Sequence, residues 1–439
     1  MSSVTPVVAP LHAIRYQVAT GDLSALLAPP FDVIGAEEQA WLYQQHPHNV
    51  VRLELGKSFP TDTPADNCYL RAAATLRSWL AEGVLAQDDP PGIYPYRHSF
   101  LWQGQLRRRL GCFCLVRLSE FSQGVVLPHE DTRPRAKADR RELLHACQAQ
   151  ISPVFGLYRQ GGEAARLLAS CLQVPAAARA APGQEQLELW RVTDPALIGA
   201  WQQALGVGPF VIADGHHRYE TALAYRDEMR QSHPQAGPEA AFSYVLMMLV
   251  AADDPGLVVL PTTRLLKLGG RGRPAVEDAA AKHFERAPAA LQPGAIAPVL
   301  RQLADRGRRA YAVFTREGWL LLTLKPEVPI PTDPRGALDV SLLQHLLVDQ
   351  LLPPAAQDQR LAYVMGETDP CRAVAGGNYD AAIFLNPPQV DQVLAVAASG
   401  QRMPPKSTYF HPKPPTGLVI NPVAPGPAQP PSDPAHGLL

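Results

Sequence analysis

One short segment, residues 210–228 (FVIADGHHRYETALAYRDE), constrains the fold more than any other part of the sequence. Residues 210–213 form an apolar run of strand length, and the pattern becomes helical directly after Asp214 and Gly215. Asp214 is a favourable helix N-cap, and a glycine at the next position lets the backbone approach another group closely. The segment therefore predicts a buried strand that turns at once into a helix, so the chain must pack helices against strands.

The composition is that of a folded protein with no preference for nucleic acid. A length of 439 residues predicts two or three domains, and 46% apolar residues are enough for large cores. Forty Lys and Arg residues balance 41 Asp and Glu residues, whereas nucleic-acid-binding domains usually carry a basic excess. We therefore expect small-molecule partners and do not expect DNA.

Neither a secretion signal nor a membrane-spanning helix is predicted. The N-terminal residues lack a charged segment followed by an apolar core, and the longest apolar run, 244–252, has about half the length that a spanning helix needs. The six cysteines are scattered, and only Cys112 and Cys114 lie close together, on one face of a predicted strand. These features predict a cytoplasmic protein with reduced thiols, and they leave the oligomeric state open.

Helical and extended patterns mix without strict alternation, which predicts an α+β or mixed α/β fold. A helix over residues 69–82 is predicted to end at Gly83, and a hairpin is predicted over 92–121. Residues 243–250 and 256–266 each predict one strand. The predicted organisation is an N-terminal α/β segment (1–90), a core (91–265), a C-terminal α/β segment (266–421) and a disordered proline-rich tail (422–439).

The first turn of the helix after Gly215 carries the most distinctive residues of the chain, His216, His217 and Arg218. The first amides of a helix have no partner within it, and the helix dipole favours negative charge there. With the donors of these three side chains, the turn formed by Asp214 and Gly215 predicts a phosphate cradle. A plain helix start with surface histidines is the alternative. A metal site is less favoured, because adjacent helical residues diverge by about 100° and do not easily share one ion.

A charged loop, residues 128–141 (PHEDTRPRAKADRR), is the second candidate. Glu130 is a possible general base or magnesium ligand, and His129 is a possible proton shuttle. Asp139 and Arg140, near the start of the following helix, are further candidates. A solvated charged loop is the alternative, and the residue types alone do not decide between the two.

The third candidate is the proline-rich segment 403–417 (MPPKSTYFHPKPPTG). Lys406 and Lys413 are candidate phosphate contacts as point charges, and Ser407 and Thr408 provide hydroxyl groups beside them. The glycine-rich loop of a Walker site is missing, so that motif is not assigned. A strap that closes over the core is the alternative, and the two roles are compatible.

A single acid, Asp32, stands in the motif PPFDVI at residues 29–34. A turn residue whose carboxylate accepts a nearby amide is the favoured interpretation. A role at the mouth of the fold is the less favoured one.

The motif ADGHHRYETAL resembles the phosphate-binding box of the ParB and sulfiredoxin superfamily, and most of all the Asp-Gly-His-His-Arg box of its free serine kinases. The chain also resembles the bacterial domain-of-unknown-function 1015 family through PPFDVI, HPHNVVRLELG, LPHEDT, KADRRELL and MPPKSTYFHPKPPTGLV. It departs from that family at Phe31 and Thr263, where tyrosine and histidine are usual, and the second change removes a possible ligand. The resemblance implies that residues 91–265 form a ParB/sulfiredoxin-like nucleotide-binding core.

These residues suit phosphoryl transfer, which needs positive groups around the phosphates and a carboxylate that orients the acceptor hydroxyl. We therefore expect a nucleotide-dependent phosphotransferase that uses ATP or ADP with magnesium. The resemblance implies a small hydroxylated acceptor, and free serine is one possibility. The alternatives are a ParB-like nucleotide-binding regulator without catalysis and a hydrolase of nucleotides or phosphodiesters.

Overall fold

A computed structural model describes residues 7–17, 22–132, 134–159, 161–206, 208–366 and 368–424. The chain packs into two compact units. Unit 1 contains the chain up to residue 128, residues 132–257 and the chain from residue 412 onward. Unit 2 contains residues 129–131 and 258–411. The segment boundaries that the sequence predicts at residues 90 and 265 divide the chain differently and stay a prediction.

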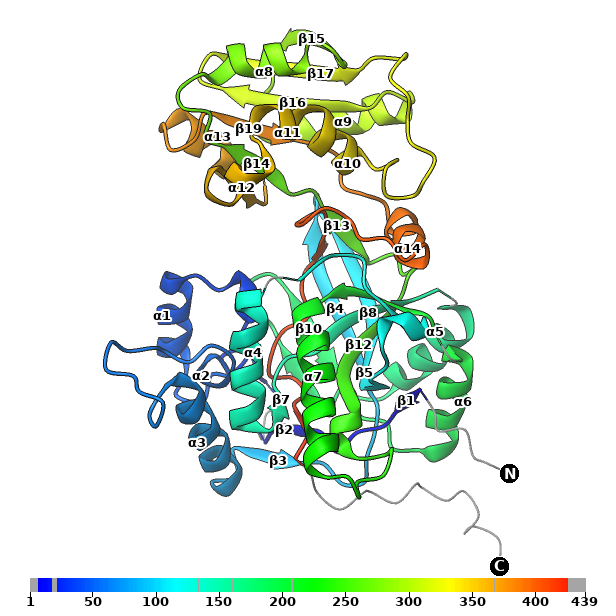
Figure 1. Cartoon of the computed structure of the whole chain (residues 1–439). Coiled ribbons are helices and arrows are strands. Elements are labelled where there is room, and N and C mark those ends of the chain that lie inside the picture. The colour runs from blue at the N-terminus through cyan, green and yellow to red at the C-terminus, as the bar shows by residue number, and fades with distance from the viewer. Residues whose placement is uncertain are drawn as a thin grey trace, which may run out of the picture. The chain divides into compact units, whose positions relative to one another are not determined.

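Unit 1 is built on a nine-stranded mixed sheet (Figure 1). In spatial order its strands are β6 (Val126–Leu127), β11 (Phe210–Asp214), β8 (Val154–Tyr158), β12 (Tyr244–Ala251), β5 (Gln105–Arg117), β4 (Tyr94–Trp102), β10 (Gln186–Leu189) and β9 (Ala178–Ala180), with β1 (Val8–Ala9) paired to β5. The pairs β11–β6 and β12–β8 are parallel, and the other pairs are antiparallel. β11 thus lies inside the sheet, which fixes the position of the residues that follow it.

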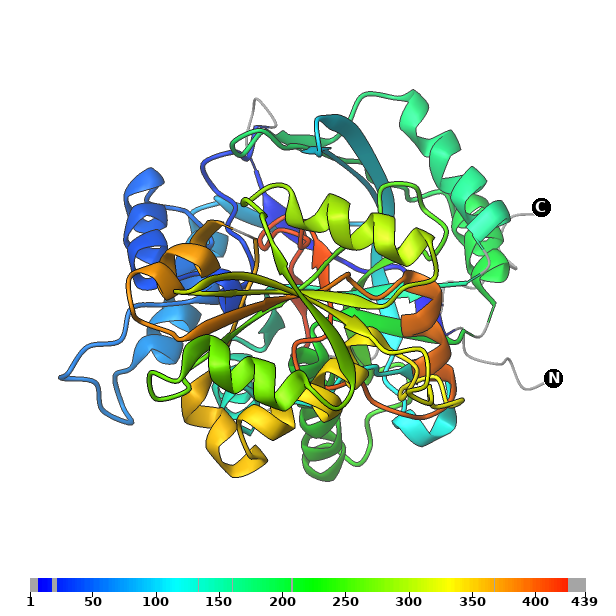
Figure 2. The same ribbon diagram turned by 90° about the horizontal axis from the view of Figure 1, so that it is seen from above.

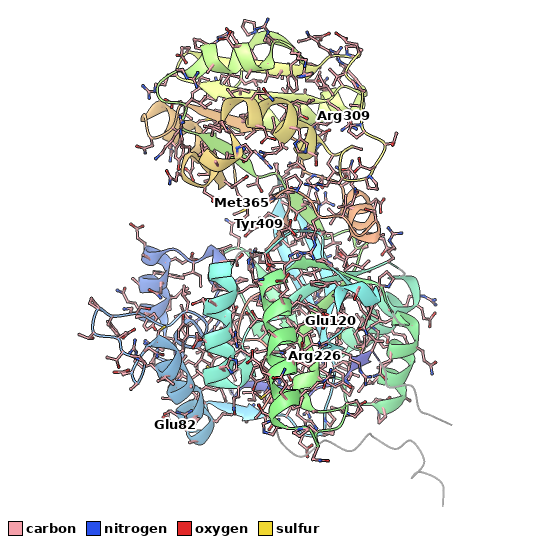
Figure 3. All side chains as sticks on the ribbon, viewed as in Figure 1. Glu82, Glu120, Arg226, Arg309, Met365 and Tyr409 are labelled. Atoms are coloured by element: carbon pink, nitrogen blue, oxygen red, sulfur yellow. The ribbon has the colours of Figure 1, made fainter. Side chains whose placement is uncertain are left out.

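The helices of unit 1 are α1 (Ala36–Gln45), α2 (Val51–Glu54), α3 (Cys68–Ala81), α4 (Pro134–Cys147), α5 (Gly161–Ser170), α6 (Pro195–Leu205) and α7 (His216–Ser232). α4 packs between α3 and α7 (Figure 1). Arg226 of α7 donates to Glu120 at 2.6 Å and to the carbonyl of Leu118 at 3.1 Å, and Arg226 and Glu120 are labelled in Figure 3. These bonds tie α7 to the segment that follows β5.

Unit 2 contains a six-stranded antiparallel sheet with helices on both sides (Figure 2). Its strands, in spatial order, are β15 (Phe284–Ala289), β17 (Gly318–Leu324), β16 (Ala310–Thr315), β19 (Ala381–Phe384), β14 (Thr263–Leu266) and β18 (Leu361–Val364). Its helices are α8 (Gly272–Ala280), α9 (Ile296–Asp305), α10 (Asp339–Leu343), α11 (Asp349–Leu351), α12 (Pro354–Arg360), α13 (Thr368–Ala375) and α14 (Val390–Ala398). Both units combine helices with strands, which confirms the predicted mixed α/β class.

Most of the predicted elements are present. The helix that the sequence places before Gly83 is α3, and Gly83 has the left-handed φ of +73° that ends many helices. The predicted hairpin is β4 and β5. The single strand predicted over residues 256–266 is wrong, because the segment forms β13 (Val258–Leu260) and β14 in different sheets, with Pro261 between them. Proline has no amide hydrogen for a ladder, so a strand readily ends there.

The C-terminal segment contributes to both units. In unit 2, β20 (Tyr409–His411) pairs with β13, and in unit 1, β21 (Asn421–Pro422) pairs with β7 (Ala149–Gln150). Val423 is buried, so ordered structure continues past residue 422, where the sequence places the start of the tail. The rest of that tail, residues 425–439, lies outside the described residues.

Short elements complete the architecture. They are the paired strands β2 (Ile14–Tyr16) and β3 (Leu85–Gln87), and the short helices η1 (Phe31–Val33), η2 (Phe121–Gln123), η3 (Cys171–Gln173), η4 (Ala241–Ser243) and η5 (Gln344–Val348). Among the helices that the structure describes, none combines the length and the apolar character that a bilayer crossing requires.

Candidate functional site

The candidate site in unit 1 begins at the turn between β11 and α7. Gly215 is the N-cap of α7, with a left-handed φ of +93° that glycine adopts without strain. The prediction that Asp214 caps the helix is wrong, because Asp214 is the last residue of β11. A Cβ at position 215 would stand 2.9 Å from Nε of Arg218. The first turn of α7 therefore begins without a side-chain cap, in a conformation that favours glycine.

Asp214 carries the charge at this turn. Its Oδ2 accepts a bond of 2.5 Å from Nη2 of Arg218, and its Oδ1 lies 2.6 Å from Nζ of Lys413. Burial alone would raise the pKa of Asp214, but the charges of Lys413 and Arg218 outweigh it and lower the pKa to about 2. The carboxylate is therefore ionised at neutral pH and held by two cations.

Arg218 faces the interior of unit 1. Its side chain is 9% exposed, Nη2 bonds Asp214, and Nη1 donates to the carbonyl of Pro153. Both terminal nitrogens therefore make a contact within the protein, whereas the buried Nε has no hydrogen-bond partner among the described residues. The geometry favours Arg218 as the residue that orients Asp214, and its predicted role as a phosphate ligand stays a prediction.

Lys413, in the segment MPPKSTYFHPKPPTG, contacts one residue of PPFDVI and one residue of ADGHHRYETAL. Its ammonium group forms ion pairs with both Asp32 and Asp214, and its side chain is 7% exposed. Burial would lower the pKa of Lys413, but the two carboxylates raise it above its ordinary value. Asp32 lies in the short helix η1 and pairs with Lys413, so its carboxylate belongs to the cluster, in contrast to the favoured turn interpretation. We call Asp32, Asp214, Arg218 and Lys413 the charge cluster; its two carboxylates balance its two cations.

The two histidines of the motif differ in exposure. His216 is buried, and its charge, when present, helps to lower the pKa of Asp214. His217 is half-buried at the second position of α7. His217 is thus the more accessible donor on the first turn of the helix.

Behind the charge cluster lies a buried acid that the sequence analysis did not single out, Glu54. It is 1% exposed, accepts a bond of 2.9 Å from Ser152 and forms an ion pair of 3.4 Å with Arg140. Burial raises the pKa of Glu54 despite the opposing charges of Arg140 and Arg218. Its signal in the sequence is an acid inside the apolar run of HPHNVVRLELG.

Arg140 and Asp139, both candidates from the sequence, lie beside this acid. Arg140 stacks over the ring of Phe31 at 3.8 Å and donates to the Asp139 carboxylate at 2.8 Å. Asp139 also accepts a bond of 2.9 Å from Tyr69. A cavity of about 40 Å³ lies between the side chains around Glu54 and Arg218 of the Asp-Gly-His-His-Arg motif. Its lining includes Glu54, Arg140, Ser152, Arg218 and Thr221. That volume holds water molecules rather than a metabolite.

The other candidates form a second group in unit 2. His129 is completely buried, and its Nε2 lies 2.8 Å from Oγ1 of Thr408. Glu130 accepts a bond of 2.9 Å from the amide of Lys406. Ser407 donates to the carbonyl of Pro404. The loop 129–131 and the segment 402–408 are therefore brought together, 276 residues apart at Glu130 and Lys406.

Lys406 is the exposed cation of this second group. Its φ of +58° is left-handed, which a non-glycine residue adopts at a cost of about 1–3 kcal/mol and often at functional sites. Glu130 and Lys406 belong to unit 2, and the turn at Gly215 belongs to unit 1. The prediction that Glu130 and the turn share one pocket stays a prediction.

Comparisons with known proteins identify the family. The family model described as "Protein of unknown function (DUF1015)" matches residues 8–341. No curated protein matches the chain. Similar solved structures include a conserved hypothetical protein from Pyrococcus furiosus (15% identity, TM-score 0.36, covering 70% of this chain and 95% of that one). A mutant free serine kinase in complex with ADP is 12% identical, with a TM-score of 0.36, and the match covers 70% of this chain and 92% of that one. A C-terminally truncated SbnI from Staphylococcus aureus is 10% identical, with a TM-score of 0.37, and the match covers 71% of this chain and 88% of that one. Because the family model spans well over half of the chain, the protein belongs to the DUF1015 family.

Proposed function

We propose that the protein is a nucleotide-dependent phosphotransferase that acts on a small hydroxylated metabolite. The observation that carries the proposal is the first turn of α7, which begins at a glycine without a side-chain cap at the end of an internal strand. The positive end of a seventeen-residue helix favours a phosphate at that point. The resemblance of the Asp-Gly-His-His-Arg motif to the box of free serine kinases supports the same ligand.

The charge cluster gives this turn its fixed geometry. Asp214, directly before Gly215, is held by Arg218 on one side and by Lys413 on the other, and these two ion pairs restrain the end of β11. His217, half-buried on the first turn, is the side chain best placed to add a donor to a phosphate there. In this proposal Arg218 and Lys413 position the turn, and the amides of α7 and His217 bind the ligand.

Magnesium would offset phosphate charge in such a reaction. The described residues include no group of three or more His, Cys, Asp and Glu side chains placed to hold a metal ion. The carboxylates of Asp32 and Asp214 are suitable oxygen ligands, but Lys413 lies between them. In this proposal the magnesium ion enters bound to the phosphates of the nucleotide, since the described residues hold no preformed group of ligands for it.

A non-catalytic nucleotide sensor is the second candidate, and one observation favours it. Both carboxylates of the charge cluster are neutralised by cations, so neither is available in this state as a general base. The remaining candidate base, Glu130, belongs to unit 2. A kinase that uses Glu130 as its base requires Glu130 to reach the nucleotide, whereas binding alone does not.

Product analysis separates these functions. The full chain is incubated with ATP or ADP, magnesium and a panel of small hydroxylated metabolites that includes L-serine, and the products are followed by ³¹P NMR. A phosphorylated acceptor supports the kinase, free phosphate alone indicates a hydrolase, and nucleotide binding without turnover indicates a sensor. Absence of nucleotide binding by calorimetry would contradict all three.

Two histidines at opposite ends of α7 test whether the turn at Gly215 binds the phosphate. His217→Ala should weaken nucleotide binding by about 10-fold, the loss of one hydrogen bond to a charged group. His233 lies exposed at the other end of the same helix, so His233→Ala should leave binding unchanged. Equal affinities of the two variants would remove the turn from the binding site.

A further inference from the structure

A buried arginine in unit 2, Arg264, forms no ion pair with any carboxylate among the residues that the structure describes. It lies on β14, between β19 and β18, directly opposite Ile383 and Tyr363. The next residue, Leu265, belongs to the apolar core on one side of the sheet, so Arg264 projects from the other side. Only 1% of Arg264 is exposed, which makes it one of the most deeply buried charged residues of the described chain.

Few contacts compensate this charge. Nη1 of Arg264 donates to the carbonyl of Thr262, and the guanidinium lies 5.5 Å from the centre of the Tyr363 ring. Within the residues that the structure describes, no carboxylate forms an ion pair with Arg264, and its Nε and Nη2 make no hydrogen bond. Nε and Nη2 form the edge of the guanidinium that binds a carboxylate through two parallel bonds.

An unpaired charge in such surroundings is unfavourable. Burial lowers the pKa of Arg264 to about 10, although Tyr363, Tyr311 and Glu130 act in the opposite direction. Even at that pKa the group is a cation at neutral pH. Buried charges in proteins are normally paired or bind a ligand, because removing an ion from water without a partner is costly. An arginine whose bidentate edge has no hydrogen-bond partner among the described residues therefore points to a bound oxyanion.

We propose that Arg264 anchors a second binding site, in unit 2, that takes the carboxylate of a small hydroxy or amino acid. Glu130 narrows the class of ligand that we expect, because the repulsion between its carboxylate and a bound anion is twice as large for a dianionic phosphate as for a monoanionic carboxylate. A hydroxyl or ammonium group on the ligand suits the acidic neighbour. If the proposed phosphotransfer holds, this carboxylic acid is the acceptor, and that identification alone rests on the proposed function.

Binding to the full-length protein tests the site. L-serine, glycolate, inorganic phosphate and sulfate are titrated by calorimetry into the wild type, Arg264→Met and Arg372→Met. Arg372 is an exposed arginine of unit 2, 78% exposed in its side chain, and controls for a general loss of positive charge. The wild type and Arg372→Met should bind a carboxylate with equal affinity, and Arg264→Met should bind it at least about 10-fold more weakly, as expected for a lost bidentate charged pair.

Stability measurements separate binding from a structural role. Without ligand, Arg264→Met should melt at the same temperature as the wild type or higher, because an unpaired buried charge is replaced by an apolar chain. Arg264→Lys keeps the charge but removes the two parallel donors of the guanidinium, so it should also bind the carboxylate more weakly. A lower melting temperature of Arg264→Met in the absence of ligand, together with no carboxylate binding by the wild type, would overturn the site.

The remaining outcomes are equally decisive. Binding of phosphate or sulfate but of neither carboxylate would overturn the assignment of the ligand class. Equal carboxylate binding by the wild type and Arg264→Met would overturn the role of Arg264. Phosphotransfer that persists in Arg264→Met would count against this site and leave the proposed function intact. Carboxylate binding at Arg264 without phosphotransfer would support this site and count against the proposed function.

Discussion

At the scale of single residues, the turn at Gly215 depends on a few side chains that fix one another. The left-handed backbone of Gly215 brings it against the guanidinium of Arg218, and Arg218 in turn holds Asp214. Lys413 completes the arrangement from a distant part of the chain, 381 residues from its other partner, Asp32. The motif is therefore a mutually supported structure rather than a row of independent phosphate ligands.

Gly215→Ala tests this close approach. The substitution should lower the free energy of unfolding by about 1–3 kcal/mol, because alanine disfavours the left-handed region and its Cβ would crowd Arg218. Gly83→Ala is the matched control: Gly83 is also left-handed, at φ +73°, but no atom lies within 4 Å of a Cβ there. Urea unfolding should show the larger loss at position 215, and equal losses would mean that the contact with Arg218 is unimportant.

The lowered pKa of Asp214 predicts a pH dependence of stability. The folded-state pKa is about 2 and the ordinary value is 3.8, so the unfolded chain binds a proton more readily. The contribution of Asp214 is therefore complete above the ordinary pKa and is lost as the pH falls through about 2. The difference in unfolding free energy between the wild type and Asp214→Asn should shrink by about 2 kcal/mol from pH 6 to pH 2. A difference that stays constant over this range would argue against the ion pairs.

At the scale of elements, a buried tyrosine hydroxyl helps to fix α7 in place, together with the bonds of Arg226. Tyr219 donates to the carbonyl of Ser119 at 2.8 Å and accepts from the amide of the same residue at 3.1 Å. Its ring also stacks on Phe121, with ring centres 5.3 Å apart. These contacts set the distance of α7 from the segment after β5, and hence the position of its first turn.

Tyr219→Phe removes this hydroxyl and leaves the buried backbone groups of Ser119 without partners. The unfolding free energy should fall by about 1–3 kcal/mol, the usual cost of an unsatisfied buried polar group. Tyr225 provides a control on the same helix, since its buried hydroxyl has no hydrogen-bond partner among the described residues. Tyr225→Phe should be close to neutral in the same denaturation experiment, and a similar cost for both variants would show that packing, not hydrogen bonding, matters.

The elements also show how far the sequence allows prediction. The strand, turn and helix at residues 210–228 follow from local periodicity and turn chemistry, and the hairpin of β4 and β5 does as well. The charge cluster does not, because the pairing of Lys413 with Asp32 and Asp214 depends on long-range packing. For the same reason, the sequence suggested that Arg218 binds a phosphate through two parallel hydrogen bonds. In the fold, its two terminal nitrogens donate to Pro153 and Asp214 instead.

At the scale of the whole molecule, the chain leaves unit 1 after residue 257 and returns to it at residue 412. The returning segment brings Lys413 to the charge cluster and forms isolated β-bridges with Ala28 and Ile14. Its apolar residues Leu418, Val419, Ile420 and Val423 are buried. Residues 412–423 thus pack within unit 1 and supply a charge of the candidate site, and the strap that the sequence offers for residues 403–417 stays a prediction.

Two truncations measure what this returning segment contributes. Ending the chain after Ala424 removes only residues beyond the described part and should leave both the melting temperature and nucleotide binding unchanged. Ending it after His411 also removes Lys413 and four buried apolar side chains, each of which contributes about 1.5–3 kcal/mol when buried. Their sum is comparable with the whole stability of a typical domain, about 5–15 kcal/mol, so unit 1 should lose its cooperative thermal transition. Lys413→Met in the full chain separates the two effects, because it keeps the apolar strap and leaves Asp32 and Asp214 without their shared cation. If the chain ending at His411 melts like the wild type, the strap is not part of the core of unit 1 in solution, and the charge cluster cannot hold the turn at Gly215 in the way described.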